Sequence, residues 1–166
     1  MNLFVVDSNF FIQAHRASYP IDIALSFWKK VRQLAHEGKI ISIDKVRAEI
    51  VKNDDELTRW VNGNLPDTFF RSTQEKSILD EYRKVVNWAS SKSGHYKQKA
   101  IDEFLEFDKA DAWLIAWCLV SGDQIVTQEV SEPNRKVKIK IPDACQTFGV
   151  SYLNMMQMLR HLGVSF

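Results

Sequence analysis

Asp7 directly follows the apolar run Leu3-Phe4-Val5-Val6. A carboxylate in this position requires a compensating partner or has a functional role. An ionised group at the end of a buried strand loses its hydration unless something compensates for that loss. In open α/β sheets the carboxyl ends of the central strands are also where ligands bind. We therefore interpret Asp7 as a metal- or phosphate-site residue, with a helix cap after a strand as the alternative.

Three further acidic residues are expected to reach the same edge of a sheet. Glu49 lies in a helical pattern after the second expected strand, Glu129 lies just past the third, and Asp111 lies near the start of a helix. Two like charges 4 Å apart repel by about 4 kcal/mol at an effective dielectric of 20, so a cation must stabilise such a cluster. Mg²⁺ takes oxygen ligands and keeps several waters, and Mn²⁺ would serve similarly. These acids are predicted to be the catalytic and metal-binding residues.

Each acidic residue also has a simpler explanation. A helical Glu such as Glu49 is often a solvated surface residue, and Asp108 could cap a helix whose positive end favours Asp111. Asp108 is otherwise expected to be an auxiliary acid one turn away. Ser8, Asn9 and Thr127 are expected to orient carboxylates or hold waters around the site, although ordinary turn chemistry also explains them.

Short apolar runs alternate with helical patterns along the chain. Strands are expected at residues 2–6, 39–43, 124–127 and 137–141. Such alternation is typical of βαβ units with a mostly parallel sheet. We therefore predict an α/β fold, a three-layer α/β/α sandwich with a short, mostly parallel central sheet, forming one domain over residues 1–166.

The helical patterns between these strands define the expected outer layers. A helix is expected from near Pro20 to Gly38, another after a cap at Asp44, polar helical segments over residues 54–105, a helix over 108–120, and a last helix capped by Ser151.

Composition excludes some classes of protein. The chain has 166 residues with 22 basic and 21 acidic side chains, so the formal net charge of +1 indicates no general affinity for nucleic acid or membranes. The two cysteines, Cys118 and Cys145, lack metal-ligand spacing and indicate a reducing compartment. No signal peptide or transmembrane segment is expected, which predicts a soluble, cytoplasmic protein without membrane contact.

Contact with a polyanionic substrate would need a local basic patch. Arg16, Lys45 and Arg47 are predicted to bind substrate, while Lys138 is among basic residues expected to lie farther from the site. For most such residues solubility is the simpler explanation. None of the four histidines is assigned a catalytic role.

Taken in order, the acidic motifs resemble those of PIN-domain nucleases. The matching segments are VVDSN at residues 5–9, VRAEI at 46–50, ADAWLIA at 110–116 and VTQE at 126–129. The segment KIPDAC at 140–145 is similar to a PIN subfamily found in toxin–antitoxin loci. Glu129 departs from the family, which often has Asp at this position.

This resemblance implies a Mg²⁺- or Mn²⁺-dependent endoribonuclease that acts as the toxin of a type II toxin–antitoxin pair. Its implied partners are RNA and an antitoxin protein, which Trp60 and Trp88 could help to dock unless they form a homodimer face or simply core. One alternative is a PIN-like binding module that has lost the metal. The other is a haloacid-dehalogenase-like phosphatase, which would need an acid two residues after Asp7, where this chain has Asn9.

Overall fold

The computed structural model describes residues 2–166 and has a five-stranded, all-parallel sheet at its centre. The strand order is β3-β2-β1-β4-β5. The strands are β1 (Phe4–Val6), β2 (Ile40–Ile43), β3 (Phe70–Arg71), β4 (Gln124–Val126) and β5 (Tyr152–Leu153). The predicted α/β class and three-layer sandwich are confirmed.

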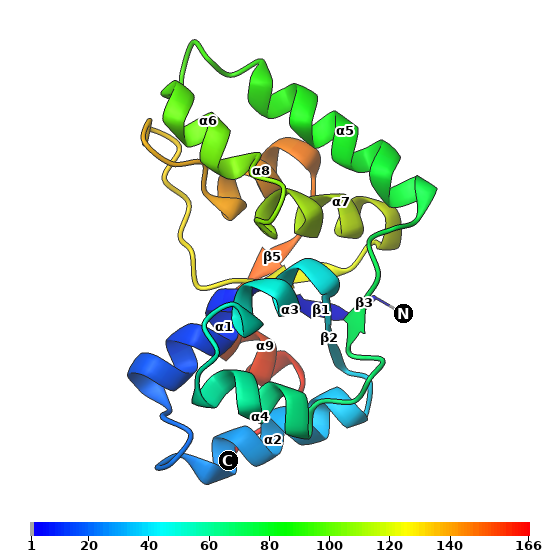
Figure 1. Ribbon diagram of the computed structural model, residues 1–166, viewed down its shortest axis with the longest axis vertical. Helices are drawn as coiled ribbons and strands as arrows, with labels where there is room; N and C mark the ends of the chain where they lie inside the picture. Colours follow the sequence, from blue (N-terminus) through cyan, green and yellow to red (C-terminus); the bar gives the residue numbers. More distant parts are fainter. Residues whose placement is uncertain (1) are drawn as a thin grey trace.

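Helices cover both faces of this sheet (Figure 1). One layer contains α5 (Lys76–Ser90), α6 (Gln98–Phe104), α7 (Asp111–Ser121) and α8 (Ile141–Phe148). The other contains α1 (Ser8–Gln13), which continues as the π-helix η1 (Ala14–Ser18), with α2 (Leu25–His36), α4 (Glu56–Asn64) and α9 (Met155–His161). Helix α3 (Asp44–Val51) follows β2 and packs against α1.

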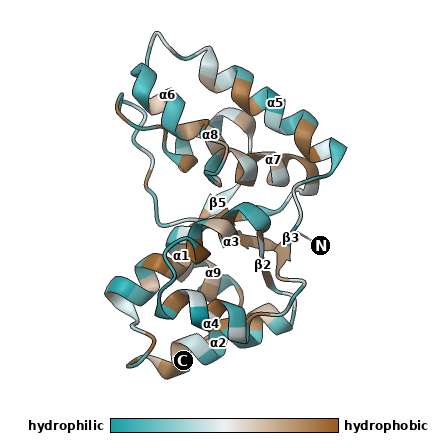
Figure 2. Cartoon of the chain, in the orientation of Figure 1, coloured by the Kyte–Doolittle hydropathy of each residue, from teal (hydrophilic) through white to brown (hydrophobic). Residues whose placement is uncertain are grey.

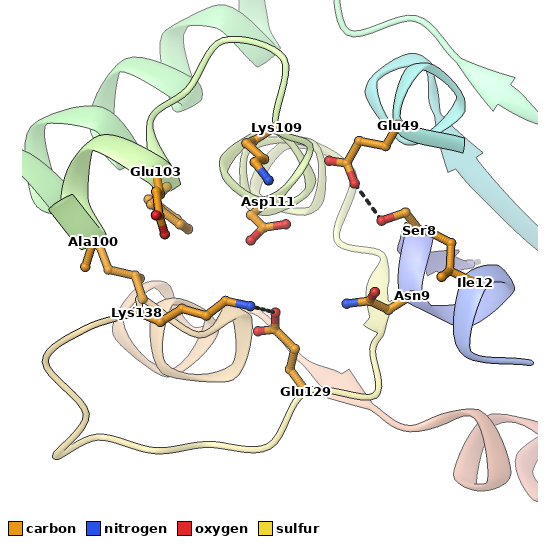
Figure 3. Close-up of a pocket in the computed structure, with 12 residues that line it drawn as sticks. Ser8, Asn9, Ile12, Glu49, Ala100, Glu103, Lys109, Asp111, Glu129 and Lys138 are labelled. Carbon is orange, nitrogen blue, oxygen red and sulfur yellow. Dashed lines mark hydrogen bonds and ion pairs between the residues drawn. The ribbon is translucent and has the colours of Figure 1, made fainter. Parts of the chain in front are cut away.

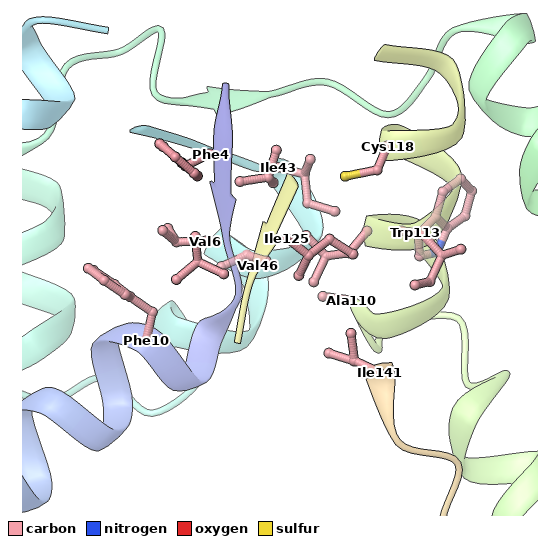
Figure 4. Packing of buried hydrophobic residues seen from close by; sticks show 14 of the residues in the cluster. Phe4, Val6, Phe10, Ile43, Val46, Ala110, Trp113, Cys118, Ile125 and Ile141 are labelled. Atoms are coloured by element: carbon pink, nitrogen blue, oxygen red, sulfur yellow. The ribbon is translucent and has the colours of Figure 1, made fainter. Parts of the chain in front are cut away.

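Burial on both faces explains why the central strands are mostly apolar, with Ser42 of β2 donating its hydroxyl to the Val6 carbonyl at 2.6 Å. Every residue of β1 and of β2 is buried. Phe4 and Val6 lie on the same side of the sheet as Phe10, and α7 closes the other side with Trp113 and Cys118 (Figure 4). Helix α5 alternates between hydrophilic and hydrophobic residues, as expected for a helix with one buried side (Figure 2).

The chain changes direction across the sheet between β1 and β4. From β1 it adds β2 and then β3 on one side, and it later returns to place β4 and β5 on the other side. The backbone N–H of Asp7 donates to the carbonyl of Val126 at 3.1 Å, so the ends of β1 and β4 are joined at this point. Such a topological switch point is the usual ligand crevice of a parallel sheet.

The prediction of a strand at residues 137–141 is wrong. Residues 136–140 form an irregular connection, and Ile141 is the first residue of α8, with Pro142 in its first turn. Apolar and basic residues alternate in its sequence VKIKI, as in a half-buried strand, but Val137 is exposed while Ile139 is buried, so the two do not share one buried face as strand residues would. The place beside β4 is occupied instead by β5, which the sequence analysis did not identify.

Several helix boundaries also differ from the predictions. Helix α2 begins at Leu25, five residues after Pro20, and Ile23 lies before it with 77% of its surface exposed. Ser151 precedes β5, and Asn154 caps the last helix by accepting from the Gln157 N–H. Strand β3, which interrupts the predicted helical middle segment, was also missed.

Asp44 does not cap its own helix. It is the first residue of α3, and its carboxylate accepts hydrogen bonds from the N–H and hydroxyl of Thr73. It therefore holds the chain after β3 against the start of α3.

The structure also bears on the two cysteines and on membrane-spanning segments. Cys118 and Cys145 are both buried free thiols. Within residues 2–166, no helix combines the length and the apolar character needed to cross a membrane.

Candidate functional site

Asp7 is both a helix cap and a buried group at the switch point. It is the N-cap of α1, and its Oδ1 accepts from the Phe10 N–H at 3.0 Å. Its Oδ2 accepts from the Thr127 hydroxyl at 2.8 Å. The side chain is nevertheless 2% exposed, and burial raises the pKa of Asp7 to about 7, although both hydrogen bonds lower it. The cap therefore compensates only part of the cost of burying this carboxylate.

Asp111 is the first residue of α7 and has the most perturbed carboxylate of the site. Burial is the largest cause that raises the pKa of Asp111 to about 8, and the charges of Glu129, Glu49 and Asp7 raise it further. Lys138 acts in the opposite direction. The effect of the Asp7 charge on the pKa of Asp111 indicates that the fold brings these two acids near each other, although they are 104 positions apart in the sequence.

Glu49 connects three helices at the edge of the site. One carboxylate oxygen accepts from the Ser8 hydroxyl of α1 at 2.6 Å, and the other accepts from the backbone N–H of Ala110, the N-cap of α7, at 2.5 Å. Glu49 is therefore not the solvated surface residue of the alternative interpretation. It fixes the start of α7 next to α1 and α3.

Glu129 lies after β4 with both carboxylate oxygens engaged. Oε1 accepts from the Lys138 ammonium at 3.1 Å, and Oε2 accepts from the Ile141 N–H at 2.7 Å. The backbone N–H of Glu129 donates to Thr127 Oγ1 at 3.1 Å. Thr127 therefore links the Glu129 backbone to the Asp7 carboxylate and positions both acids.

These residues surround a pocket of about 320 Å³ (Figure 3). Asp111 points into its centre, with Glu49 and Asn9 on one side and Glu129 and Lys138 on the other. Asp7 does not line the pocket and lies buried beside it. The lining residues are Ser8, Asn9, Ile12, Glu49, Ala100, Glu103, Phe104, Lys109, Asp111, Glu129, Lys138 and Ile139. We call this the acidic pocket.

The donor chemistry of the acidic pocket fits a hard divalent cation. All candidate ligands are carboxylate, hydroxyl or amide oxygens, which Mg²⁺ and Mn²⁺ prefer. No three acidic, histidine or cysteine side chains of residues 2–166 are grouped so that they could hold one ion together. Mg²⁺ is usually bound through one or two carboxylates and several waters, so an ion here would rest on Asp111 with at most one further carboxylate.

Asp108 and the basic residues predicted to bind substrate do not line the acidic pocket. Asp108 does not cap α7, whose N-cap is Ala110, and it forms an exposed 3.7 Å ion pair with Lys52. The Lys45 ammonium lies 4.2 Å from the centroid of the Phe107 ring. Arg47 donates to the Asn62 side chain at 3.3 Å.

Arg16 is an exposed residue of η1 whose charge acts on Asp55. The sequence-based selection of Arg16, Lys45 and Arg47 for the site is therefore not supported by their positions. It rested on distance along the chain, which does not determine the direction of a side chain.

Two lysines and one acid of the acidic pocket were missed as site residues. Lys109 precedes α7 by two positions, Glu103 lies on α6, and Lys138 lies in the segment wrongly predicted to be a strand. The position of Lys109 beside Asp111 was a usable sequence signal for its proximity. Nothing in the sequence placed α6 or residues 136–140 next to the switch point.

The comparisons with known proteins assign a family to this chain. No curated protein matches it. The chain matches the family described as "Domain of unknown function (DUF4411)" over residues 4–166, and therefore nearly over its whole length. The chain belongs to the DUF4411 family.

Proposed function

We propose that this protein is a PIN-like, metal-dependent endoribonuclease that hydrolyses RNA phosphodiesters with Mg²⁺ or Mn²⁺. One observation carries the proposal. Asp111 projects into a pocket where Glu49, Glu129 and Asp7 all raise its pKa, and the sum of these charges calls for a cation. The four acids are those whose motifs resemble the PIN nucleases, and they come from four separate segments.

A divalent ion in such a pocket would lower the pKa of a bound water and stabilise negative charge on phosphate oxygens. Asp111 is the residue best placed to hold the ion, because it faces the pocket. Asp7 supplies negative charge from beside the pocket, and Thr127 holds its carboxylate in one orientation. Glu49 and Ser8 fix each other across the rim of the pocket.

The cellular setting follows from the same resemblance. We propose that the protein acts in the cytoplasm as the toxin of a type II toxin–antitoxin pair, with RNA as substrate and an antitoxin protein as partner. The half-buried Trp60 and Trp88 pack against the core, so any antitoxin or homodimer contact would use only their exposed parts.

The test is cleavage of a mixed-sequence RNA by the purified protein with Mg²⁺, with Mn²⁺ and with EDTA. The Asp111→Asn variant should lose at least about 100-fold in rate, in the range seen when one charge-stabilising group is removed from a catalytic site. Asp80→Asn is the matched control, because Asp80 pairs with Lys76 and Arg83 on the surface of α5. Equal activity of Asp111→Asn and wild type, or no cleavage by the wild type with either metal, would contradict the proposal.

A PIN-like binding module without nuclease activity is the second candidate. It is favoured by Glu129, whose two carboxylate oxygens are both engaged by groups of the protein. For this candidate, the wild-type protein should bind RNA or a partner protein while showing no metal-dependent cleavage.

A further inference from the structure

Lys138 is held over the acidic pocket by a connection that is anchored on both sides of it. The Lys97 N–H donates to the carbonyl of Lys136 at 2.8 Å, and the Ile141 N–H donates to Glu129 at 2.7 Å. Between these bonds, Ile139 is buried with 1% of its surface exposed. Ile139 thus fixes this segment against the core, and the adjacent Lys138 side chain lines the acidic pocket. The direction of Lys138 is therefore set by the fold.

The ammonium of Lys138 is only partly committed to the protein. It donates to Glu129 Oε1 at 3.1 Å, and its side chain is 44% exposed, whereas the Glu129 side chain is 7% exposed. A lysine ammonium has three donors, so two remain after this bond. Figure 3 shows the ammonium directed into the pocket, toward the Glu129 carboxylate.

The surrounding acids favour a cation at this point. The positive charge of Lys138 attracts the carboxylates, and it lowers the pKa of Asp111. Burial lowers the pKa of Lys138, but the charges of Glu129 and Asp111 and the hydrogen bond to Glu129 together raise it above its ordinary value. Lys109, the other lysine of the pocket, is an exposed residue before α7. Lys138 is thus the cation most closely engaged with the acids.

We infer that Lys138 is the phosphate-binding residue of the acidic pocket, using its free donors to hold a phosphodiester oxygen of the substrate. The inference rests on the proposed function and adds a residue to it. A compact ammonium binds phosphate as a point charge and tolerates different phosphate orientations. The same ammonium neutralises Glu129, so it opposes the binding of a second cation near that carboxylate.

These two roles predict opposite effects of one substitution. Lys138→Met removes a phosphate-binding charge, so RNA cleavage should fall about 10- to 100-fold, the usual effect of losing a hydrogen bond to a charged group. It also leaves Glu129 without its cation, so the affinity for Mn²⁺ should rise by several fold. A residue that only stabilised the fold would change both quantities in the same direction.

The experiment compares wild type with Lys138→Met, Lys138→Arg and the control Lys136→Met, which removes the same charge from an exposed position of the same segment. Free Mn²⁺ is measured by electron paramagnetic resonance without RNA, and kcat and KM are measured on a mixed-sequence RNA with saturating Mn²⁺. We expect weaker cleavage and tighter Mn²⁺ binding in Lys138→Met, partial rescue of cleavage in Lys138→Arg, and wild-type values in Lys136→Met.

The possible failures are distinguishable. If the wild type cleaves RNA and Lys138→Met cleaves it equally well, the inference is wrong while the proposed function stands. If Lys138→Met loses both cleavage and Mn²⁺ affinity and Lys138→Arg does not recover them, Lys138 has only a structural role and the inference is again wrong. A wild-type protein that cleaves no RNA overturns the proposed function, and the inference with it.

Discussion

The hydroxyl of Thr127 donates to Asp7 Oδ2 at 2.8 Å and thereby joins the carboxyl ends of β4 and β1. Both residues are buried. The same hydroxyl oxygen accepts from the Glu129 N–H at 3.1 Å. One small side chain thus determines the geometry of two acids at the switch point of the sheet.

Thr127→Val should destabilise the protein, because it leaves a buried carboxylate oxygen and a backbone N–H without their partner. The expected loss is about 1–3 kcal/mol in the free energy of unfolding, the usual cost of an unsatisfied buried polar group. Urea denaturation in EDTA measures this loss. Thr127→Ser keeps the hydroxyl and should lose less, so a Ser variant as unstable as the Val variant would contradict the role of the hydrogen bond.

The metal-free protein should become less stable as pH rises, and Asp111 should cause part of this loss. Its pKa is about 8 in the folded state, against an ordinary value of 3.8. Between these values the folded state binds the proton and the unfolded state does not, so the contribution of Asp111 to stability is greatest below pH 4 and is lost as pH rises from 4 to 8.

Asp111→Asn removes this titration while keeping the size of the side chain. The stability of the variant relative to the wild type should therefore increase between pH 5 and pH 8, by up to about 4 kcal/mol given roughly 1.4 kcal/mol per pH unit. Urea denaturation at the two pH values in EDTA measures the gain. A constant difference between the two proteins would show that Asp111 does not titrate in this range.

Divalent cations should stabilise the protein more at pH 8 than at pH 5. At pH 5 the pKa values of about 7 for Asp7 and about 8 for Asp111 keep both groups protonated in the folded protein, so a metal must displace protons. At pH 8 most of that competition has disappeared. Thermal unfolding with and without 5 mM Mn²⁺ at each pH gives the comparison, and an equal rise in Tm at both pH values would contradict the prediction.

Glu49→Ala should loosen the start of α7 without unfolding the sheet. The Glu49 carboxylate accepts the Ala110 N–H, so its removal leaves that donor unpaired. Hydrogen exchange at the Ala110 amide should become at least about tenfold faster, corresponding to a loss of about 1.4 kcal/mol in local stability. Amides of β1 and β2, which are buried in the core, serve as the internal control and should keep their protection.

The sequence was sufficient to predict those features that depend on local pattern. The buried runs of β1, β2 and β4, the α/β class and the approach of Asp7, Glu49, Asp111 and Glu129 to one edge all follow from apolar strands and from the geometry of parallel sheets. The same local logic failed at residues 137–141, where alternation did not distinguish a strand from an extended connection.

Only the tertiary structure decided which side chains accompany these acids. Lys138 reaches the acidic pocket because burial of Ile139 and the bond between Ile141 and Glu129 orient its segment. Lys45 and Arg47 pack against Phe107 and Asn62 instead. The physical reason is that a strand's burial is set by its own residues, whereas the direction of a long charged side chain is set by neighbours that are distant in the chain.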